Sequence, residues 1–184
     1  MRLETKRLII REWEDRDRAP YAAINADPEV RRYYENIPSE EEVNRWIDLF
    51  IERFKTHGYY WLAIERKSDG ALIGDVGLAP IDEATKALMR RPADIEIGWL
   101  LGRQYWGQGY CPEAAQAWLD FAWEELGAPE IVAFTARDNA KSERVMQKLG
   151  MARDPSSDFD NPRTPEGHWL RPHIVYRIAN PRGV

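Results

Sequence analysis

The stretch Gln104-Tyr105-Trp106-Gly107-Gln108-Gly109-Tyr110 decides the fold. It joins an alternating apolar segment, which is typical of a strand, to a segment with the spacing of an amphipathic helix. Two glycines one residue apart permit backbone conformations that other residues avoid, and they let a ligand approach the main chain closely. The N-terminus of the following helix offers unpaired N–H groups and the positive end of the helix dipole. The stretch therefore predicts a turn that binds phosphate or pyrophosphate.

Two glycines at this spacing also fit a plain turn between a strand and a helix, without any ligand. Pro112 stands where the dinucleotide fingerprint Gly-x-Gly-x-x-Gly needs its third glycine, and the lysine of a P-loop does not follow the glycines. The same proline suits the first turn of a helix, where its missing N–H costs nothing. The spacing thus argues against a dinucleotide-binding fold and against a kinase that clamps phosphate with a lysine.

Outward from the turn, the period of the apolar residues alternates between that of strands and that of helices. We expect strands over residues 2–13, 59–66, 71–80, 94–101, 130–136 and 173–178. We expect helices over residues 17–26, 39–54, 114–126 and 140–149. An extended segment starts at residue 151, and loops are predicted over residues 81–93, as an exposed loop, and 155–167. This order indicates a mixed α/β domain around a central sheet.

Several element boundaries carry chemical signals. Ser39 and Glu42 form a capping box at the start of a helix, and Asn139 is a good cap for the helix over 140–149. Asp69-Gly70 predicts a tight hairpin turn between two strands. These signals place the predicted boundaries to within a few residues.

The composition of the 184 residues excludes several protein classes. Hydrophobic residues make up 43%, which fits one domain over residues 1–184. With 26 basic and 31 acidic residues, the net charge of −5 gives no general attraction to nucleic acid or to an anionic membrane. No apolar run approaches the ~20 residues that cross a bilayer, and the N-terminus lacks a signal core. The single Cys111 forms no internal disulfide, so we expect a cytoplasmic protein.

The motif Gln104-x-x-Gly107-x-Gly109 resembles the Gln/Arg-x-x-Gly-x-Gly/Ala signature of the GNAT acyl-CoA-dependent N-acetyltransferases. Further stretches resemble the branch that includes the ribosomal-protein N-terminal acetyltransferases: Glu96-Ile97-Gly98-Trp99, Gly109-Tyr110 with Glu113-Ala114, Asn139-x-x-Ser142 ahead of Lys148-Leu149-Gly150-Met151, and Leu3-Glu4-Thr5-Lys6-Arg7-Leu8. The resemblance covers essentially the whole chain. It implies a GNAT-type fold, in which helices flank a mixed, mostly antiparallel central sheet.

The resemblance also implies a binding site for acetyl-CoA as cosubstrate, without a metal. In this family the strand before the signature splays from its neighbour, and the pantetheine arm fills the gap. The backbone of Trp99-Leu100-Leu101 is implied to pair with the pantetheine amides. The N–H groups of residues 104–109, with Tyr110 beside them, are implied to hold the pyrophosphate. We expect Cys111 to fill the helix start and to carry no acetyl group, because the family transfers the group directly.

Acetylation of an amine needs a base for the amine proton and a proton for the departing thiolate. Glu96 is the first candidate base, because it lies on the strand that leads to the turn, opposite the face of Ile95 and Ile97. The alternative is an edge carboxylate paired with an arginine. Ser142 is implied by the resemblance to donate to the thiolate, with a plain helix serine as the alternative. Asn139 caps its helix and is implied to touch pantetheine.

Other side chains are weaker candidates. Asp158 or Asp160 lies where the resembling branch can carry an acidic catalytic residue, and His168 at a groove rim is a candidate acid or base. His168 and His173 have no further His or Cys nearby, so we expect no metal site. Contact with the cofactor is one interpretation of Lys141, Arg144 and Lys148, and a solvated helix face is the other. An acceptor wall is one interpretation of the following aromatic residues, and plain packing is the other: Tyr33, Tyr34, Trp46, Phe50 and Phe54.

Together these expectations favour an N-acetyltransferase that moves an acetyl group from acetyl-CoA to a primary amine by direct attack in a ternary complex. A protein N-terminus and a small-molecule amine are both open as acceptors. The alternative is an acyl-CoA-binding sensor or scaffold with little turnover, which the lack of an unambiguous base favours. Neither nucleic acid nor a membrane is expected as a partner. Dimers are frequent in the family, and nothing in the sequence specifies one.

Overall fold

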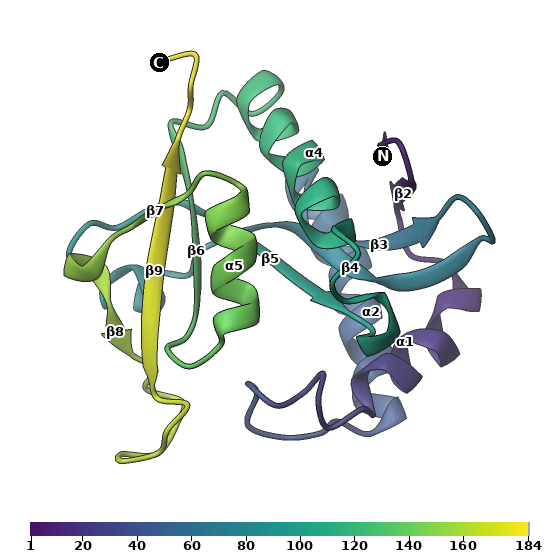
Figure 1. Cartoon of the computed structure of the whole chain (residues 1–184), viewed down its shortest axis with the longest axis horizontal. Coiled ribbons are helices and arrows are strands. Elements are labelled where there is room, and N and C mark those ends of the chain that lie inside the picture. Colours follow the sequence, from purple (N-terminus) through teal and green to yellow (C-terminus); the bar gives the residue numbers. More distant parts are fainter. Residues whose placement is uncertain (184) are drawn as a thin grey trace. The chain divides into compact units, whose positions relative to one another are not determined.

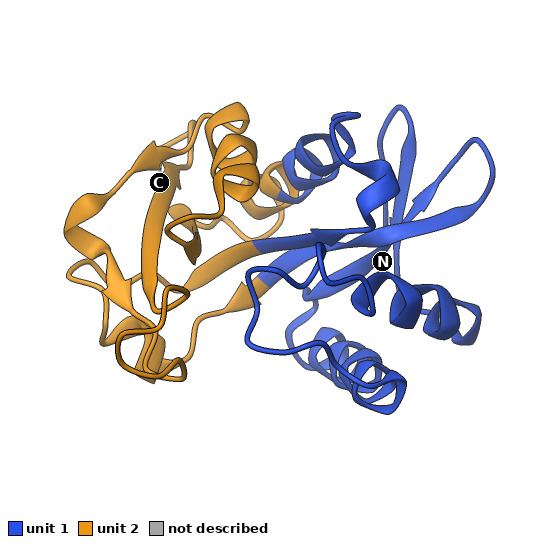
Figure 2. Ribbon diagram, turned by 60° about the horizontal axis from the view of Figure 1, so that its bottom comes forward, with its two compact units in different colours: residues 1–78, 98–118 blue, residues 79–97, 119–184 orange. Residues whose placement is uncertain are grey.

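The computed structural model describes residues 1–183, which form two compact units (Figure 2). Unit 1 contains residues 1–78 and 98–118, and unit 2 contains residues 79–97 and those described from residue 119 onward. The expectation of a single domain over residues 1–184 stays a prediction. Within residues 1–183, no helix is both long and apolar enough to cross a membrane.

Unit 1 carries an antiparallel run of strands (Figure 1). Strand β1 (Arg2–Glu4) pairs with β2 (Leu8–Arg11), β2 with β3 (Trp61–Arg66), and β3 with β4 (Ala71–Pro80). Strand β5 (Ile95–Leu101) follows β4 in the strand order, and both strands continue into unit 2. The helices and 3₁₀ turns are η1 (Asp15–Asp17), α1 (Arg18–Asn25), α2 (Glu40–His57), η2 (Arg103–Tyr105) and the first turns of α4 (Tyr110–Glu124).

Helices cover both faces of the strands of unit 1 (Figure 2). On one face, α1 and α2 share a buried core with β3, β4 and β5, formed by Trp13, Tyr21, Ile24, Val30, Val43, Ile47, Phe50, Ala63, Leu72 and Leu100. Helix α4 lies against β4, since the indole of Trp118 donates to the carbonyl of Val76 over 3.1 Å. This packing fixes the end of β5, where the glycine turn begins.

Unit 2 is built around β9 (Pro172–Ala179). Strand β6 (Glu130–Ala136) pairs antiparallel with β9 over its whole length, and the short strands β7 (Ala152–Arg153) and β8 (Phe159–Asp160) pair with β9 as well. Strand β6 also pairs in parallel with β5, at Glu96 and Val132. The remaining elements are α3 (Glu83–Lys86), α5 (Ala140–Lys148) and η3 (Pro155–Ser157). The expected mixed α/β class with a mostly antiparallel sheet is confirmed.

Three expected segments are wrong in detail. Residues 2–13 form two strands, because a turn closed by the N–H of Thr5 on the carbonyl of Leu8 (3.0 Å) separates them. Residues 81–93 are not a fully exposed loop. Asp82 caps the short helix α3, and three apolar side chains are buried with Val132, namely Ile81, Met89 and Ala93. The predicted loop 155–167 contains η3 and β8.

The chemical signals at element boundaries are confirmed. The N–H of Ser39 donates to the carboxylate of Glu42 (2.7 Å), and the N–H of Glu42 donates to the hydroxyl of Ser39 (3.2 Å), which is the predicted capping box. Gly70 has φ +70° in the hairpin between β3 and β4. The carboxamide oxygen of Asn139 accepts from the N–H of Ser142 (3.2 Å) at the start of α5.

Candidate active site

The glycine turn has the backbone conformation that its sequence predicts. Gly107 has φ +74° and Gly109 has φ +77°, both in the left-handed region that favours glycine. The backbone N–H groups of residues 107–111 have no acceptor within residues 1–183. A Cβ at Gly107 would meet no atom within 4 Å, so the space over the turn is open. Five neighbouring donors without a partner form a concave site that fits an anion.

The first half of the turn is held by its own hydrogen bonds. The N–H of Tyr105 donates to the carbonyl of Gly102 (2.9 Å), which closes η2. The indole of Trp106 donates to the carbonyl of Leu101 (2.8 Å), and the carboxamide of Gln108 donates to the carbonyl of Gln104 (2.8 Å). None of these bonds uses the N–H groups of residues 107–111, which stay available for a ligand.

The second half of the turn is held by Arg7, from the turn between β1 and β2. Its guanidinium donates to the carbonyl of Gln108 (2.8 Å) and to Glu113 (2.6 Å), and it lies over the ring of Tyr110 (4.4 Å). Glu113 also accepts from the hydroxyl of Thr5 (2.6 Å) and from the N–H of Arg7 (2.8 Å). Burial opposes the charge of Glu113, but these donors together lower the pKa of its carboxyl. The N-terminal motif, which contains Thr5 and Arg7, and the start of α4, which contains Tyr110 and Glu113, therefore meet in one hydrogen-bond network.

Glycines allow the strand before the turn to pack closely against its neighbours in unit 1. A Cβ at Gly98 would lie 2.9 Å from the indole nitrogen of Trp61. A Cβ at Gly74, where φ is +150°, would lie 2.1 Å from the carbonyl oxygen of Leu100. Side chains at either position would displace this end of β5. Trp99 is half-buried, whereas Leu100 and Leu101 are buried.

Glu96 lies on β5 within unit 2 and has no hydrogen-bond or ion-pair partner within the described residues. Burial, assisted by the nearby Asp82, raises the pKa of Glu96 to about 8, and Arg163 partly offsets this shift. The alternative of an edge carboxylate paired with an arginine is therefore wrong. A carboxyl with a pKa near neutrality is suited to take up and release a proton.

Asn139 and Ser142 lie at the start of α5. The carboxamide of Asn139 is used within the protein, since it donates to the hydroxyl of Thr135 (2.9 Å) and accepts from Ser142. The hydroxyl of Ser142 is half-buried and has no partner within residues 1–183. Asn139 is thus a cap, and the hydroxyl of Ser142 is available as a donor.

The weaker acid–base candidates have structural partners. Asp158 forms a two-pronged ion pair with Arg153 (2.6 and 2.5 Å), and Asp160 pairs with Arg171 (3.4 Å). The ring of His173 stacks on Phe159 (5.3 Å), and burial lowers its pKa. Within residues 1–183 no group of three or more His, Cys, Asp or Glu is placed to hold a metal ion.

The other candidates divide between exposed and buried positions. Lys141, Arg144 and Lys148 of α5 are exposed. Phe50 is buried in the core of unit 1, and Trp46 packs against that core. Burial raises the pKa of the Cys111 thiol well above its usual value, which suits a packing role at the helix start.

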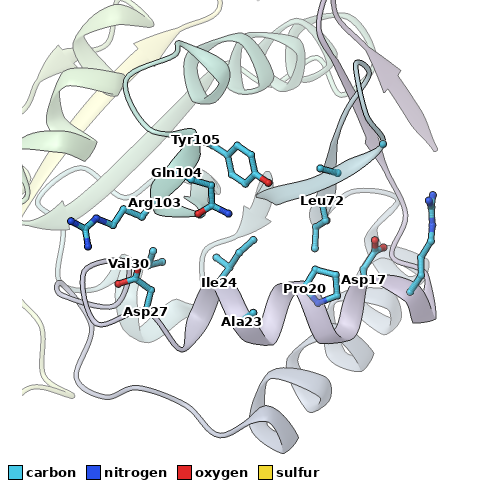
Figure 3. A pocket seen from close by; sticks show the side chains of 14 residues that line it. Asp17, Pro20, Ala23, Ile24, Asp27, Val30, Leu72, Arg103, Gln104 and Tyr105 are labelled. Atoms are coloured by element: carbon cyan, nitrogen blue, oxygen red, sulfur yellow. The ribbon is translucent and has the colours of Figure 1, made fainter.

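A cleft of about 460 Å³ lies beside the turn, on the side of α1 (Figure 3). Ile24 and Asp27 form its floor, and Gln104 and Tyr105 face them across it. Gly107 and Gly109 do not line it, so the cleft is separate from the unpartnered N–H groups of the turn.

Sequence reasoning missed a second polar cluster, on the α1 side of unit 1. The hydroxyl of Tyr21 donates to Asp75 (2.8 Å), and both side chains are buried. The buried Arg31 donates to the carboxamide of Asn25 (3.3 Å). The one signal of this cluster in the sequence was Asp75, a single aspartate in the apolar run of β4.

Comparison with known proteins identifies the family. The Acetyltransferase (GNAT) domain family matches residues 7–152, which include the turn, Arg7 and Glu113. The chain belongs to the GNAT family. As a GNAT protein it is an N-acetyltransferase, of a family that uses acetyl-CoA. It is 31% identical over 155 residues to the uncharacterized N-acetyltransferase YoaA of Bacillus subtilis, covering 83% of each chain.

Solved GNAT structures have the same fold. An acetyltransferase (GNAT family) from Bacillus anthracis superposes with a TM-score of 0.79 at 25% identity, covering 98% of this chain and 99% of that one. A ribosomal-protein-S5-alanine acetyltransferase from Vibrio fischeri superposes with a TM-score of 0.70 at 18% identity, covering 98% and 97%. The latter likeness shows the fold alone.

Proposed function

We propose that this GNAT protein binds acetyl-CoA at the glycine turn and transfers the acetyl group to a primary amine. The observation that carries the proposal is the row of N–H groups at residues 107–111, which have no acceptor within the described chain. A pyrophosphate would supply acceptors to these donors, next to the N-terminus of α4. The guanidinium of Arg7, 41% exposed, adds a positive charge at the same place.

The acetyl thioester supplies an activated carbonyl carbon, and the residues of this chain would position it. We assign the backbone of Trp99-Leu100-Leu101 to the pantetheine amides, as the family resemblance implies. The close packing of Gly98 on Trp61 and of Gly74 on Leu100 supports this assignment, because it makes the strand rigid. A rigid strand fixes the direction of an extended ligand that pairs with it.

Proton handling is assigned to Glu96 and Ser142. In the reaction a carbon–nitrogen bond forms, the carbon–sulfur bond breaks, and the proton lost by nitrogen must reach sulfur. Glu96 would take the amine proton, since its carboxyl has no partner and its pKa of about 8 lies near the working range. Ser142 would donate to the leaving thiolate, since its hydroxyl has no partner within residues 1–183.

The acceptor stays open between a protein N-terminus and a small-molecule amine. The Vibrio fischeri neighbour is named for acetylation of a ribosomal-protein alanine, but its likeness extends only to the fold. We therefore propose a primary amine as the acceptor class. Cytoplasmic location, and a dimeric state of the kind frequent in the family, stay predictions.

The test is calorimetry of the purified protein with acetyl-CoA, followed by a turnover assay with a panel of amines and peptides. We expect saturable binding of acetyl-CoA and release of free CoA with at least one amine. Binding without turnover on any acceptor would favour the sensor. Absence of binding at millimolar acetyl-CoA would exclude the site at the turn.

A further inference from the structure

Arg31 is a buried arginine that forms no ion pair within residues 1–183, although the charge of Asp75 acts on it. The residue is only 8% exposed, and its hydrogen bonds go to two neutral groups, the carbonyl of Asn36 (3.2 Å) and the carboxamide of Asn25 (3.3 Å). No carboxylate within residues 1–183 forms an ion pair with it. Burial lowers its pKa, yet a guanidinium keeps its charge in proteins. A buried charge of this kind normally needs a partner.

Two aromatic rings hold the guanidinium in place. Its central carbon lies 3.7 Å from the centre of the Tyr34 ring and 5.2 Å from that of Trp46. Such contacts fix the plane of the guanidinium fork before any ligand arrives. The Nη2 group of Arg31 has no acceptor within the described residues, so one arm of a rigid fork is available.

Asp75 is the complementary case on β4. The residue is 5% exposed, and its Oδ1 accepts from the hydroxyl of Tyr21 (2.8 Å). Besides its own backbone N–H, no further donor within residues 1–183 binds the carboxyl, and no lysine or arginine of those residues lies within ion-pair distance of it. Burial raises the pKa of Asp75 to about 7, although the hydroxyl of Tyr21, the charge of Arg31 and the backbone N–H of Asp75 itself partly offset the shift. The cost of burying this carboxyl is therefore only partly met inside the protein.

The two groups belong to one cluster. Asn25 links them, because it accepts from Arg31 and donates to the backbone carbonyl of Tyr21 (3.0 Å). Within the described residues, the one fully enclosed side-chain polar atom without a partner is Oδ1 of Asn44. The free atoms of Arg31 and Asp75 are therefore not fully enclosed, and each residue keeps a small exposed fraction, 8% and 5%.

The cluster adjoins the strand that we assign to the cosubstrate. Asp75 directly follows Gly74, whose backbone packs on Leu100 of β5. Asp75 is thus next in the chain to the residue that contacts the strand assigned to pantetheine.

We propose that Arg31 and Asp75 form an acceptor subsite for a small primary amine that also carries a carboxylate, as a free amino acid does. This inference rests on the proposed acetyl transfer. Oδ2 of Asp75 accepts an N–H of the amine, and Nη2 of Arg31 donates to the carboxylate. A polyamine fits this subsite poorly, because it would place a second cation against the guanidinium of Arg31. A peptide N-terminus also fits poorly, because it would offer Arg31 a neutral carbonyl in place of a carboxylate.

The test compares matched acceptors at saturating acetyl-CoA. The twenty common L-amino acids are screened first, and the best one is compared with its carboxamide and with the corresponding decarboxylated amine. These three differ only at the carboxylate. We expect kcat/KM for the amino acid to exceed that for the other two by at least tenfold. Equal rates for the three, or acetylation of a peptide or polyamine without any amino acid, would overturn the proposal.

The Arg31→Gln variant tests the residue itself, with Arg32→Gln as the matched control, because the Arg32 side chain is 58% exposed. We expect R31Q to lose the preference for the acid over the amide while its calorimetric Kd for acetyl-CoA stays within about twofold. Arg31→Lys should restore part of the preference for the acid over the amide. It replaces R31Q as the test variant if R31Q does not fold. A preference that survives both substitutions contradicts the assignment of Arg31. Loss of acetyl-CoA binding by the wild-type protein would instead contradict the proposed function.

Discussion

The turn cluster and the α1-side cluster of unit 1 both combine an arginine, a carboxylate and an aromatic ring, and they use these groups in opposite ways. In the turn cluster, Arg7 lies over Tyr110 and pairs with Glu113 at 2.6 Å. In the α1-side cluster, Arg31 lies over Tyr34 and forms no ion pair within the described residues, and Asp75 accepts from the hydroxyl of Tyr21.

The pKa values show the difference between the two clusters. The donors around Glu113 lower its pKa, whereas burial raises that of Asp75 to about 7. A carboxylate that is satisfied by its own chain stabilises the fold and positions a backbone segment. A carboxylate that its own chain leaves unsatisfied weakens the fold, and is available to a ligand. The same residue types therefore serve structure in one place and recognition in the other.

The largest effect is expected at the turn that the first cluster holds. Gly107→Asp should weaken acetyl-CoA binding by at least about 100-fold, because it adds a side chain in the left-handed region and a negative charge beside the pyrophosphate. Calorimetry measures the change. Gly167→Asp is the matched control, since Gly167 has φ +77° and equally open surroundings. Equal affinities in the two variants would remove the turn from the site.

The next effect concerns Glu96, whose carboxyl has no hydrogen-bond or ion-pair partner within residues 1–183. Glu96→Gln should lower kcat by about 100-fold or more with little change in the Kd for acetyl-CoA. In the wild-type protein the rate should rise with pH around pH 8, because the base acts in its deprotonated form. Asp82→Asn should shift this rise to lower pH, because Asp82 raises the pKa of Glu96. Initial rates measured between pH 6 and 9.5 test both expectations. A wild-type rate in E96Q would mean that another group acts as the base.

A smaller effect is expected from breaking the paired cluster. Glu113→Gln removes the charge that binds Thr5 and Arg7, so acetyl-CoA affinity should fall by about 10-fold and the free energy of unfolding by about 1–3 kcal/mol. Glu124→Gln is the control in the same helix, since its pair with Arg182 is exposed and contributes little. Denaturant unfolding and calorimetry give both quantities. Identical values for the two variants would mean that the network does not support the turn.

The last effect separates the two clusters by how their stability depends on pH. The pKa of Asp75 is about 7 in the folded protein against 3.8 as reference, so its proton is held more tightly when folded. Its contribution to stability is therefore complete below about pH 4 and is lost as the pH rises to about 7. Asp75→Asn should abolish that decline, so the variant gains stability over wild type across this range. If the free energy of unfolding of both proteins changed with pH in the same way, the raised pKa of Asp75 would be contradicted.

Local patterns predicted the parts of the molecule that short-range chemistry determines. The spacing of Gly107 and Gly109 predicted a turn with open backbone donors, because a positive φ is a property of a single residue. The capping box at Ser39 and the cap at Asn139 involve residues three positions apart, and both are confirmed. The mixed α/β class followed from the order of such segments.

Contacts between distant residues could not be predicted in this way. Arg7 and Glu113 are 106 positions apart, so no local pattern indicated that one holds the other. Nor did the sequence indicate that Asp75 lies under Tyr21, because a single aspartate in an apolar strand also fits a bulge or an edge. The burial of Met89 depends on Val132, which belongs to a strand more than forty residues further on. Tertiary packing, which alternation along one segment does not encode, decides these positions.

The bonds from Thr5 and Arg7 to the start of α4 have a practical consequence for work with this enzyme. Trimming the first seven residues, or clamping them within a fusion partner, would remove or displace the brace behind the glycine turn while leaving the buried layers untouched. Preparations altered there should look well folded by circular dichroism and yet need far more coenzyme to reach full speed. Affinity handles are better attached at the other terminus.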